Sequence, residues 1–214
     1  MPNKSDKLVA LLAGQPVIPV LRIADAKRAV LLARALARGG LPAIEITLRT
    51  DDAVEAIRRV AGEVGEAIVG AGTILDPAQY EAAVYAGARF IVSPGITKEL
   101  LKASADSDVP FLPGAITPGE IMAARQAGLN FLKFFPAEQA GGAAFLKALA
   151  APIADVRFCP TGGVSPANAS TYLGLPNVIC VGGSWVAPDD LVEKEDWSRI
   201  EELAREASGL RKAG

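Results

Sequence analysis

Residues 127–134 read AGLNFLKF, and this stretch holds the two signals that decide the fold. Gly128 follows an alanine-rich amphipathic segment, where a glycine can take the left-handed conformation that ends a helix. The short apolar run that begins at Phe131 fits a buried strand. The same order of helix, glycine and strand occurs in ARGGLPAI (37–44) and AGARFIV (86–92). The chain is therefore predicted to alternate helices with parallel strands.

Strand-like and helix-like runs alternate along all 214 residues, with no linker or change in composition between them. The helix-ending glycines Gly39, Gly87 and Gly128 are about two units apart, as eight βα units in a chain of this length require. Residues 1–214 are therefore predicted to form one domain, an α/β fold of the single (β/α)8 TIM-barrel type with a short N-terminal helix. An open, doubly wound sheet is the alternative, because alternation alone does not show that the sheet closes. The predicted strands are 16–23, 43–48, 67–73, 90–95, 111–117, 131–137, 157–163 and 178–186.

Several predicted helices begin with a capping residue followed by a proline, which suits the first helical position. These pairs are Asp76-Pro77, Thr117-Pro118 and Ser165-Pro166. The segment 196–214 is predicted to form a final amphipathic helix with a polar tail.

The composition narrows the classes of function. With 22 basic and 24 acidic residues, the chain has no basic field of the kind that binds nucleic acid. The apolar patch at the N-terminus is too short for a signal peptide, and no other stretch could span a bilayer, which predicts a cytoplasmic protein without a membrane partner. Cys159 and Cys180 lie in apolar runs and are expected to be reduced thiols.

The chain contains no histidine. This absence argues against a Ser-His-Asp hydrolase and a Cys-His protease, and it removes the commonest ligand of zinc, iron and copper sites. A metal site is therefore not expected, and no cofactor is expected either. Any chemistry must come from carboxylates, lysines, hydroxyl groups and backbone dipoles.

The second predicted strand carries polar residues where a barrel strand is usually apolar. Alternation along AIEITLRT (43–50) separates an apolar set from Glu45, Thr47 and Arg49. Because a barrel buries both faces of its strands, we expect the apolar set under the helices and the polar set inside, rising toward the C-terminal mouth. A half-exposed edge strand is the alternative. The apolar set is Ile44, Ile46 and Leu48.

Lys133 lies within the apolar run FLKFFPAE (131–138), and a buried lysine is rare because its ammonium must lose water. The same alternation places it with Phe131 and Phe135 on the inward face. Such a lysine can extend its amine to solvent at a strand end, or form a structural ion pair with a core glutamate. A carboxylate and a guanidinium are predicted in the same interior, however, and converging charges indicate a functional site.

Paired glycines follow the seventh and eighth predicted strands, in PTGG (160–163) and VGGSW (181–185). In barrel enzymes, backbone amides at these two strand ends, near a helix N-terminus, commonly bind phosphate. Paired glycines also occur in simple tight turns, but two pairs on neighbouring strands favour a phosphate site. Its predicted ligands are Gly162, Gly163, Gly182, Gly183 and Ser184.

Together these motifs resemble the 2-keto-3-deoxy-6-phosphogluconate aldolases, a family that also covers 4-hydroxy-2-oxoglutarate aldolase activity. The resemblance extends over nearly the whole chain. Its most specific part combines a lysine shortly before FPAE, E-x-x-x-R on the second strand and GAGT on the third. The segments that carry it, in order, are PVIPVLR, IEITLRT, VGAGT, IVSPG, PGAITPGE, LKFFPAE, PTGG and VGGSW.

The resemblance implies a role for each matching position. Lys133 matches the Schiff-base lysine, and Glu45 matches the carboxylate that transfers protons. Arg49 and Thr73 match the residues that bind the substrate carboxylate. Ser184 stands where some relatives have threonine, which keeps the hydroxyl group. The remaining matches are Pro94 and Phe135 in the pyruvate pocket, and Thr161, Gly162, Gly163 and Ser184 at the distal hydroxyls and phosphate.

The activity implied by the resemblance is that of a class I aldolase. Such an enzyme cleaves 2-keto-3-deoxy-6-phosphogluconate reversibly to pyruvate and glyceraldehyde 3-phosphate, and it needs no metal. Its lysine must react as an uncharged amine, which desolvation among Phe131, Phe134 and Phe135 and a nearby Arg49 cation would favour. The relatives are commonly cytoplasmic homotrimers that serve the Entner–Doudoroff route or 4-hydroxy-2-oxoglutarate breakdown.

Three alternatives stay open. The enzyme could prefer 4-hydroxy-2-oxoglutarate or the galactonate epimer, which need the same imine and differ at the distal end, although Thr161 and Ser184 favour the phosphorylated gluconate compound. A barrel isomerase of phosphorylated metabolites would have the glycine site without a covalent lysine. A catalytically silent barrel would bind a keto acid without releasing pyruvate.

Overall fold

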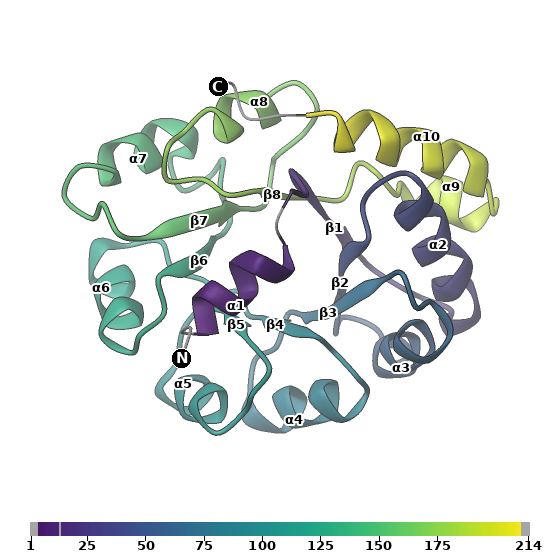
Figure 1. The fold of residues 1–214 in the computed structure, drawn as a ribbon, viewed down its shortest axis with the longest axis horizontal. Coiled ribbons are helices and arrows are strands. Elements are labelled where there is room, and N and C mark those ends of the chain that lie inside the picture. Colours follow the sequence, from purple (N-terminus) through teal and green to yellow (C-terminus); the bar gives the residue numbers. More distant parts are fainter. Residues whose placement is uncertain (1–3, 13, 211–214) are drawn as a thin grey trace.

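Eight strands and ten helices make up the described part of the chain, residues 4–12 and 14–210 of this computed structural model (Figure 1). Each strand lies within its predicted run but is shorter, and β5 has only two residues. The strands are β1 (Val17–Leu21), β2 (Ala43–Thr47), β3 (Ile68–Gly72), β4 (Phe90–Val92), β5 (Phe111–Leu112), β6 (Phe131–Phe134), β7 (Arg157–Pro160) and β8 (Val181–Gly183). The helices are α1 (Lys4–Leu11), α2 (Ala26–Arg38), α3 (Ala53–Glu63), α4 (Pro77–Tyr85), α5 (Lys98–Ala105), α6 (Pro118–Gln126), α7 (Gly142–Leu149), α8 (Ala169–Leu173), α9 (Asp189–Glu193) and α10 (Trp197–Ser208).

The strands close into a barrel. Six of them form one parallel sheet in the order β5-β4-β3-β2-β1-β8, and β6 pairs with β7 in a second sheet. Bridges join the two sheets on both sides, from Gly114 to Lys133 between β5 and β6, and from Thr161 to Gly182 between β7 and β8. Figure 1 shows the helices arranged around this ring of strands. The predicted (β/α)8 barrel is therefore confirmed, and the open sheet is excluded.

The predicted N-terminal helix is α1, which crosses one end of the ring in Figure 1. Its Leu8, together with the following Leu12, is fully buried in a cluster with Phe90 and Phe131. Phe90 and Phe131 are the first residues of β4 and β6, so α1 covers the end of the barrel where the strands begin. The opposite end, where the strands finish, is left for a site.

Two separate hydrophobic clusters confirm the predicted faces of the strands. Ile44 and Ile46 are fully buried in the larger cluster, which includes the helices packed around the barrel. Phe131 and Cys159 belong to the smaller cluster inside the barrel, next to α1. The polar face of β2 therefore points into the barrel, as the alternation predicts, and the edge-strand alternative is wrong. Both cysteines of the chain, Cys159 and Cys180, are buried thiols.

Two of the three predicted helix starts are confirmed. The side chain of Asp76 accepts a hydrogen bond from the Gln79 backbone N–H at the start of α4. At α6, Thr117 and Glu120 form a reciprocal capping box. The third prediction is wrong, because α8 begins after Asn168 rather than after Ser165. The Asn168 side chain accepts from the Ser165 backbone N–H at 2.8 Å, and this turn occupies the residues that would have formed the first helical turn.

The glycine signals are correct at Gly87 and Gly128, which have φ values of 98° and 80°. At the first of the three sites the positive φ, 92°, falls on Gly40 instead of Gly39. Gly39 is needed for a different reason, because a Cβ there would lie 2.4 Å from the Cβ of Ala204 in α10. The final helix α10 packs against α2 through this close approach. The last four residues of the predicted segment 196–214 lie outside the described residues.

No helix of the described ranges is both long and apolar enough to cross a membrane.

Candidate functional site

Lys133 is the third of the four residues of β6. Its side chain extends into the barrel interior, and the residue is only 5% exposed. Its Nζ lies 5.5 Å from the centre of the Phe135 ring, within reach of a cation–π contact. Phe135 directly follows β6 and is exposed, so this contact lies where the strand ends. The lysine is therefore buried, as predicted, and does not extend its amine to solvent.

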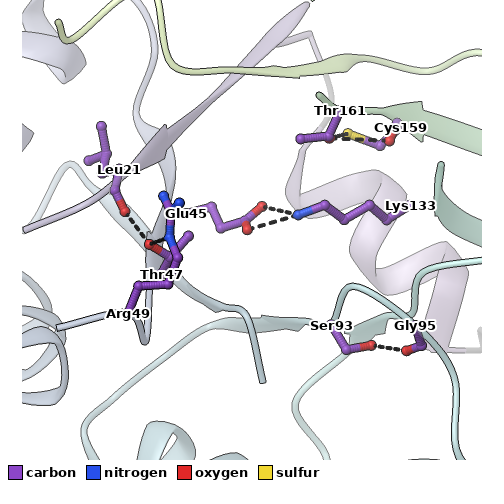
Figure 2. A network of polar contacts seen from close by, with 9 residues as sticks. All are labelled: Leu21, Glu45, Thr47, Arg49, Ser93, Gly95, Lys133, Cys159 and Thr161. Atoms are coloured by element: carbon purple, nitrogen blue, oxygen red, sulfur yellow. Dashed lines mark hydrogen bonds and ion pairs between the residues drawn. The ribbon is translucent and has the colours of Figure 1, made fainter. Parts of the chain in front are cut away.

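Glu45 faces Lys133 from the opposite wall of the barrel (Figure 2). Its Oε1 lies 3.0 Å from the lysine Nζ and its Oε2 lies 3.4 Å away. The Glu45 side chain is 4% exposed, and the side-chain atoms of Lys133 are 7% exposed. The residues are 88 positions apart in sequence, and the alternation in two separate strands is what brings them together. The predicted convergence of charges is confirmed for this pair.

A buried ion pair is weak evidence of a stabilising role, because removing two charges from water costs several kcal/mol or more. This pair contains an amine and a carboxylate close enough to exchange a proton directly. Amine and carboxylate can therefore supply a nucleophile and a general base or acid at one place. The arrangement suits chemistry at a carbonyl group.

Phe134 does not surround the amine as predicted. Its ring stacks on Phe145 of α7, with 5.7 Å between the ring centres, and meets Phe158 edge-on. Phe134 therefore lies on the outer face of β6, since side chains alternate along a strand. Of the three phenylalanines expected to desolvate Lys133, only Phe131 and Phe135 share its face.

Arg49 follows the end of β2 and is exposed, so the polar face of this strand rises from a buried carboxylate to an accessible guanidinium. The guanidinium Nε donates to Thr47 Oγ1 at 3.0 Å, and the Thr47 hydroxyl donates to the Leu21 carbonyl at 2.8 Å (Figure 2). This anchoring occupies Nε and leaves the two terminal nitrogens for a ligand, which suits bidentate binding of a carboxylate. Arg49 stands on the Glu45 side of the barrel, across from Lys133.

A cavity of about 310 Å³ lies beside Arg49, and its size is at the lower end of the usual range for small-molecule sites. The predicted ligand Ser184 lines it. Two charged side chains at the same wall, Arg22 and Asp189, are residues that the sequence analysis missed. The signal for Arg22 was present, because it directly follows β1 as Arg49 shortly follows β2.

Thr161 and the paired glycines lie together where β7 and β8 end. Thr161 is bridged to Gly182, and a Cβ at Gly182 would lie 2.2 Å from the Thr161 Oγ1. Gly162 and Gly163 have φ values of 95° and 77°, which favour glycine. Gly183 is needed for space, since a Cβ there would overlap the Trp185 ring. The structure thus brings the two predicted glycine pairs to one end of the barrel.

Thr73 and Pro94 follow the C-terminal ends of β3 and β4, at the same end of the barrel. Thr73 has a φ of 60°, a conformation that a β-branched residue rarely adopts. Such strain is found mostly at functional sites. The Pro94 carbonyl packs against Gly114, where a Cβ would lie 2.1 Å from the oxygen. No polar contact joins either residue to the Lys133–Glu45 pair in the described structure.

Among residues 4–12 and 14–210, no group of three or more His, Cys, Asp or Glu side chains is arranged to hold a metal ion.

Gly72 in the neighbouring strand β3 leaves the space that the Glu45 carboxylate occupies. Gly72 pairs with Thr47 across β2 and β3, and the Glu45 side chain reaches over it. A Cβ at Gly72 would lie 2.1 Å from Glu45 Oε1, so we expect Gly72→Ala to displace the carboxylate from Lys133. The variant should lose about 1–3 kcal/mol of unfolding free energy, as overpacked cores do, in urea denaturation. Gly62→Ala in α3 is the control, because a Cβ there meets no atom within 4 Å and alanine favours the helix. Equal stability of the two variants would contradict this role of Gly72.

The sequence of the chain matches the profile of the family described as KDPG and KHG aldolase over residues 9–203. The KHG/KDPG aldolase of Escherichia coli K12 is 49% identical over 207 residues, which cover 97% of each chain. The 2-dehydro-3-deoxy-phosphogluconate aldolase of Pseudomonas aeruginosa is 48% identical over 205 residues, with 96% of this chain and 93% of the relative covered.

Solved structures agree with these relatives. The KDPG aldolase of Legionella pneumophila, which was captured with pyruvate as a covalent carbinolamine, superimposes with a TM-score of 0.91 and 44% identity over 94% of this chain and 97% of its own. The 2-keto-3-deoxy-6-phosphogluconate aldolase of Zymomonas mobilis ZM4 with 3-phosphoglycerate has a TM-score of 0.93 and 43% identity over 98% of each chain.

Proposed function

Because this chain belongs to the KDPG and KHG aldolase family, we propose that it is a class I aldolase, a carbon–carbon lyase. Its proposed reaction is the reversible cleavage of 2-keto-3-deoxy-6-phosphogluconate (KDPG) to pyruvate and glyceraldehyde 3-phosphate. The observation that supports this most directly is the buried Lys133 amine with the Glu45 carboxylate 3.0 Å away. The proposed catalytic residues are Lys133 and Glu45.

The first step joins the enzyme to the substrate. Glu45 accepts a proton from Lys133, and the uncharged Nζ attacks the 2-keto carbon to form a carbinolamine. Glu45 then returns a proton to the carbinolamine oxygen, water leaves, and an iminium forms between Nζ and C2. Both proton transfers need a carboxylate within hydrogen-bonding distance of the amine, which the pair provides.

The second step breaks the C3–C4 bond. Glu45 removes the proton of the C4 hydroxyl, the aldehyde is released, and the bonding electrons move to the iminium nitrogen to give a neutral enamine. Protonation of C3 by Glu45 restores an iminium, and its hydrolysis releases pyruvate and the free lysine. The iminium accepts the electrons, so the reaction is balanced without a metal ion or a cofactor.

Recognition of the keto acid is assigned to residues around the pair. The terminal guanidinium nitrogens of Arg49 are available for the substrate carboxylate, and Thr73 is proposed to bind it from the end of β3. Pro94 and Phe135 are proposed to line the pyruvate pocket. The contact between the Phe135 ring and the Lys133 amine supports this placement.

The distal end of the substrate is assigned to the glycine-rich end of the barrel, with Thr161 at the hydroxyl groups. The cavity beside Ser184 is lined by two guanidinium groups, of Arg22 and Arg49, against the single carboxylate of Asp189, and this excess of positive charge suits an anion such as phosphate. The proposed ligands of the phosphate are Gly162, Gly163, Gly182, Gly183 and Ser184. The second candidate is an aldolase that prefers 4-hydroxy-2-oxoglutarate (KHG), which the mixed name of the E. coli relative favours; the galactonate epimer is a further alternative.

Pyruvate release, coupled to lactate dehydrogenase, tests the proposal with each of the three substrates. All three compounds contain the cleavable bond, so we expect each of them to release pyruvate. The highest kcat/KM is expected for the phosphorylated gluconate compound. A silent binding barrel would bind the keto acid without release. A non-covalent isomerase would also give no pyruvate and would not be labelled by borohydride in the presence of pyruvate.

We further propose that the protein is a cytoplasmic homotrimer that acts in the Entner–Doudoroff pathway of carbohydrate metabolism. Large apolar side chains on its surface, among them Tyr85 at 86% exposure, are of the kind that protein interfaces cover. Sedimentation equilibrium tests the oligomeric state, and a monomer would contradict this part of the proposal.

A further inference from the structure

Glu138 ends the FPAE motif, and none of the proposed catalytic steps uses it. Its carboxylate Oε1 accepts a hydrogen bond from the hydroxyl of Tyr172 in α8. Tyr172 is only 1% exposed. Burial, and then the bond to Glu138, raise the pKa of the Tyr172 phenol, so the hydroxyl remains a donor. The buried Tyr172 side chain thus fixes the position of the Glu138 carboxylate.

The same glutamate supports the first glycine pair. Its backbone N–H donates to the Gly162 carbonyl at 3.2 Å, and the preceding Ala137 N–H donates to the Thr161 carbonyl at 2.8 Å. A Cβ at Gly163 would lie 2.6 Å from Glu138 Cγ, so the side chain packs directly against this glycine. The turn after β7 therefore rests on the segment that follows the Lys133 strand.

A second side chain fixes the other end of the glycine turn. Asn168 donates from Nδ2 to the Gly163 carbonyl at 3.1 Å. The carbonyls of both glycines are thus engaged on the protein side. Because the N–H and C=O of a trans peptide point in opposite directions, anchoring the Gly162 carbonyl directs the Gly163 N–H away from Glu138. This leaves that N–H available to an anion.

We propose that Tyr172 and Glu138 are a positioning pair, which holds the Gly162–Gly163 turn in the conformation that binds the distal phosphate. The inference rests on the proposed function, because it assumes that these amides meet the substrate phosphate. Neither residue is a catalytic residue, since both act through the turn. The pair connects α8 and the turn to the segment that follows Lys133, and so fixes the distance between the imine and the phosphate.

The acceptor atom, rather than the negative charge, is what the geometry requires of Glu138. A glutamine keeps a carbonyl oxygen for the Tyr172 hydroxyl, whereas an alanine removes both the acceptor and the Cγ packed on Gly163. A carboxylate close to a phosphate is itself unfavourable, because like charges repel. The Glu138→Gln variant is therefore the conservative replacement that should preserve function.

The experiment compares a phosphorylated ligand with a phosphate-free one. For Tyr172→Phe and Glu138→Ala, we expect a roughly three- to tenfold rise in KM for KDPG, the effect of losing about one hydrogen bond. The pyruvate concentration that gives half-maximal borohydride labelling of Lys133 should not change. Glu138→Gln should resemble the wild type in both measurements. Tyr80→Phe in α4 is the matched control, because Tyr80 is also buried and its hydroxyl donates to the Val109 carbonyl.

The outcomes separate the inference from the proposed function. An equal change in KDPG and pyruvate affinity, or no change in either, would overturn the positioning role. A rise in the KM for KDPG that is as large for Glu138→Gln as for Glu138→Ala would also overturn it. If the alanine variant does not fold, Tyr172→Phe, which removes one oxygen, decides the test. Failure of the wild type to be labelled by pyruvate would instead contradict the proposed function.

Discussion

Lys133→Arg is expected to lower kcat by about four orders of magnitude or more, and Lys133→Ala by as much. Arginine keeps a positive charge opposite Glu45, so the buried ion pair can persist. Its guanidinium does not lose its proton in proteins, however, and cannot form an imine. The two variants should therefore be equally inactive for different structural reasons. Coupled detection of pyruvate from KDPG measures the loss, and Lys147→Arg, an exposed lysine of α7, is the control.

Covalent trapping identifies the same residue without relying on loss of activity. Borohydride delivers a hydride to the iminium carbon and converts the linkage with pyruvate into a stable secondary amine. In the wild-type protein, peptide mass mapping should find this addition on Lys133, and in the arginine variant it should find none. A label on any other lysine, or an arginine variant that still turns over, would refute the assignment.

Glu45→Gln is expected to reduce kcat for cleavage by roughly 10²–10⁴-fold, the usual contribution of a positioned proton-transfer group. Glutamine has a similar shape and can still bond to the lysine, but it cannot accept and return a proton. The same variant should slow the exchange of the pyruvate methyl protons with deuterated water, followed by NMR. This exchange uses the enamine and needs no aldehyde or phosphate.

The control for the glutamate variant is Glu55→Gln on α3, where the carboxylate is part of exposed ion pairs with Arg58 and Arg59. It should leave cleavage and exchange unchanged, because surface pairs contribute little. If Glu45→Gln exchanges the methyl protons at the wild-type rate, another group transfers the proton at C3. The fold of the Glu45→Gln variant should be verified by thermal unfolding, since the buried Lys133 amine loses its charged partner.

The fold was predictable because two periodicities agree along the chain. Alternation within the strands placed Glu45 and Lys133 on inward faces, and the structure shows them in contact. The repeated helix-ending glycines predicted the unit length, although the positive φ falls on Gly40 rather than Gly39. Alternation predicts only the direction of a side chain from its strand. The closed barrel makes the inward side chains of β2 and β6 face each other, and this brings Glu45 and Lys133 into contact.

The features that were missed depend on contacts between loops. The position of Arg22 directly after β1 marks it as a candidate, but alternation no longer fixes the direction of a side chain beyond a strand end, so its contact with the cavity beside Arg49 and Ser184 did not follow from the sequence. The late start of α8 depends on Asn168, whose side chain bonds to both Ser165 and Gly163. Alternation places Phe134 on the outer face of β6. It was predicted beside the Lys133 amine only because it is next to Lys133 in the sequence.

The helix that covers the lower end of the barrel has a consequence for the order of events. Leu8 and Leu12 pack below Phe131 at the end of the barrel where the strands begin, so in the proposed reaction the aldehyde, the water and the keto acid are expected to pass through the opposite end. In that reaction the three-carbon fragment stays bound to Lys133 while the aldehyde is free to diffuse. The aldehyde must therefore leave first, and the water that releases the tether enters through the passage it has vacated.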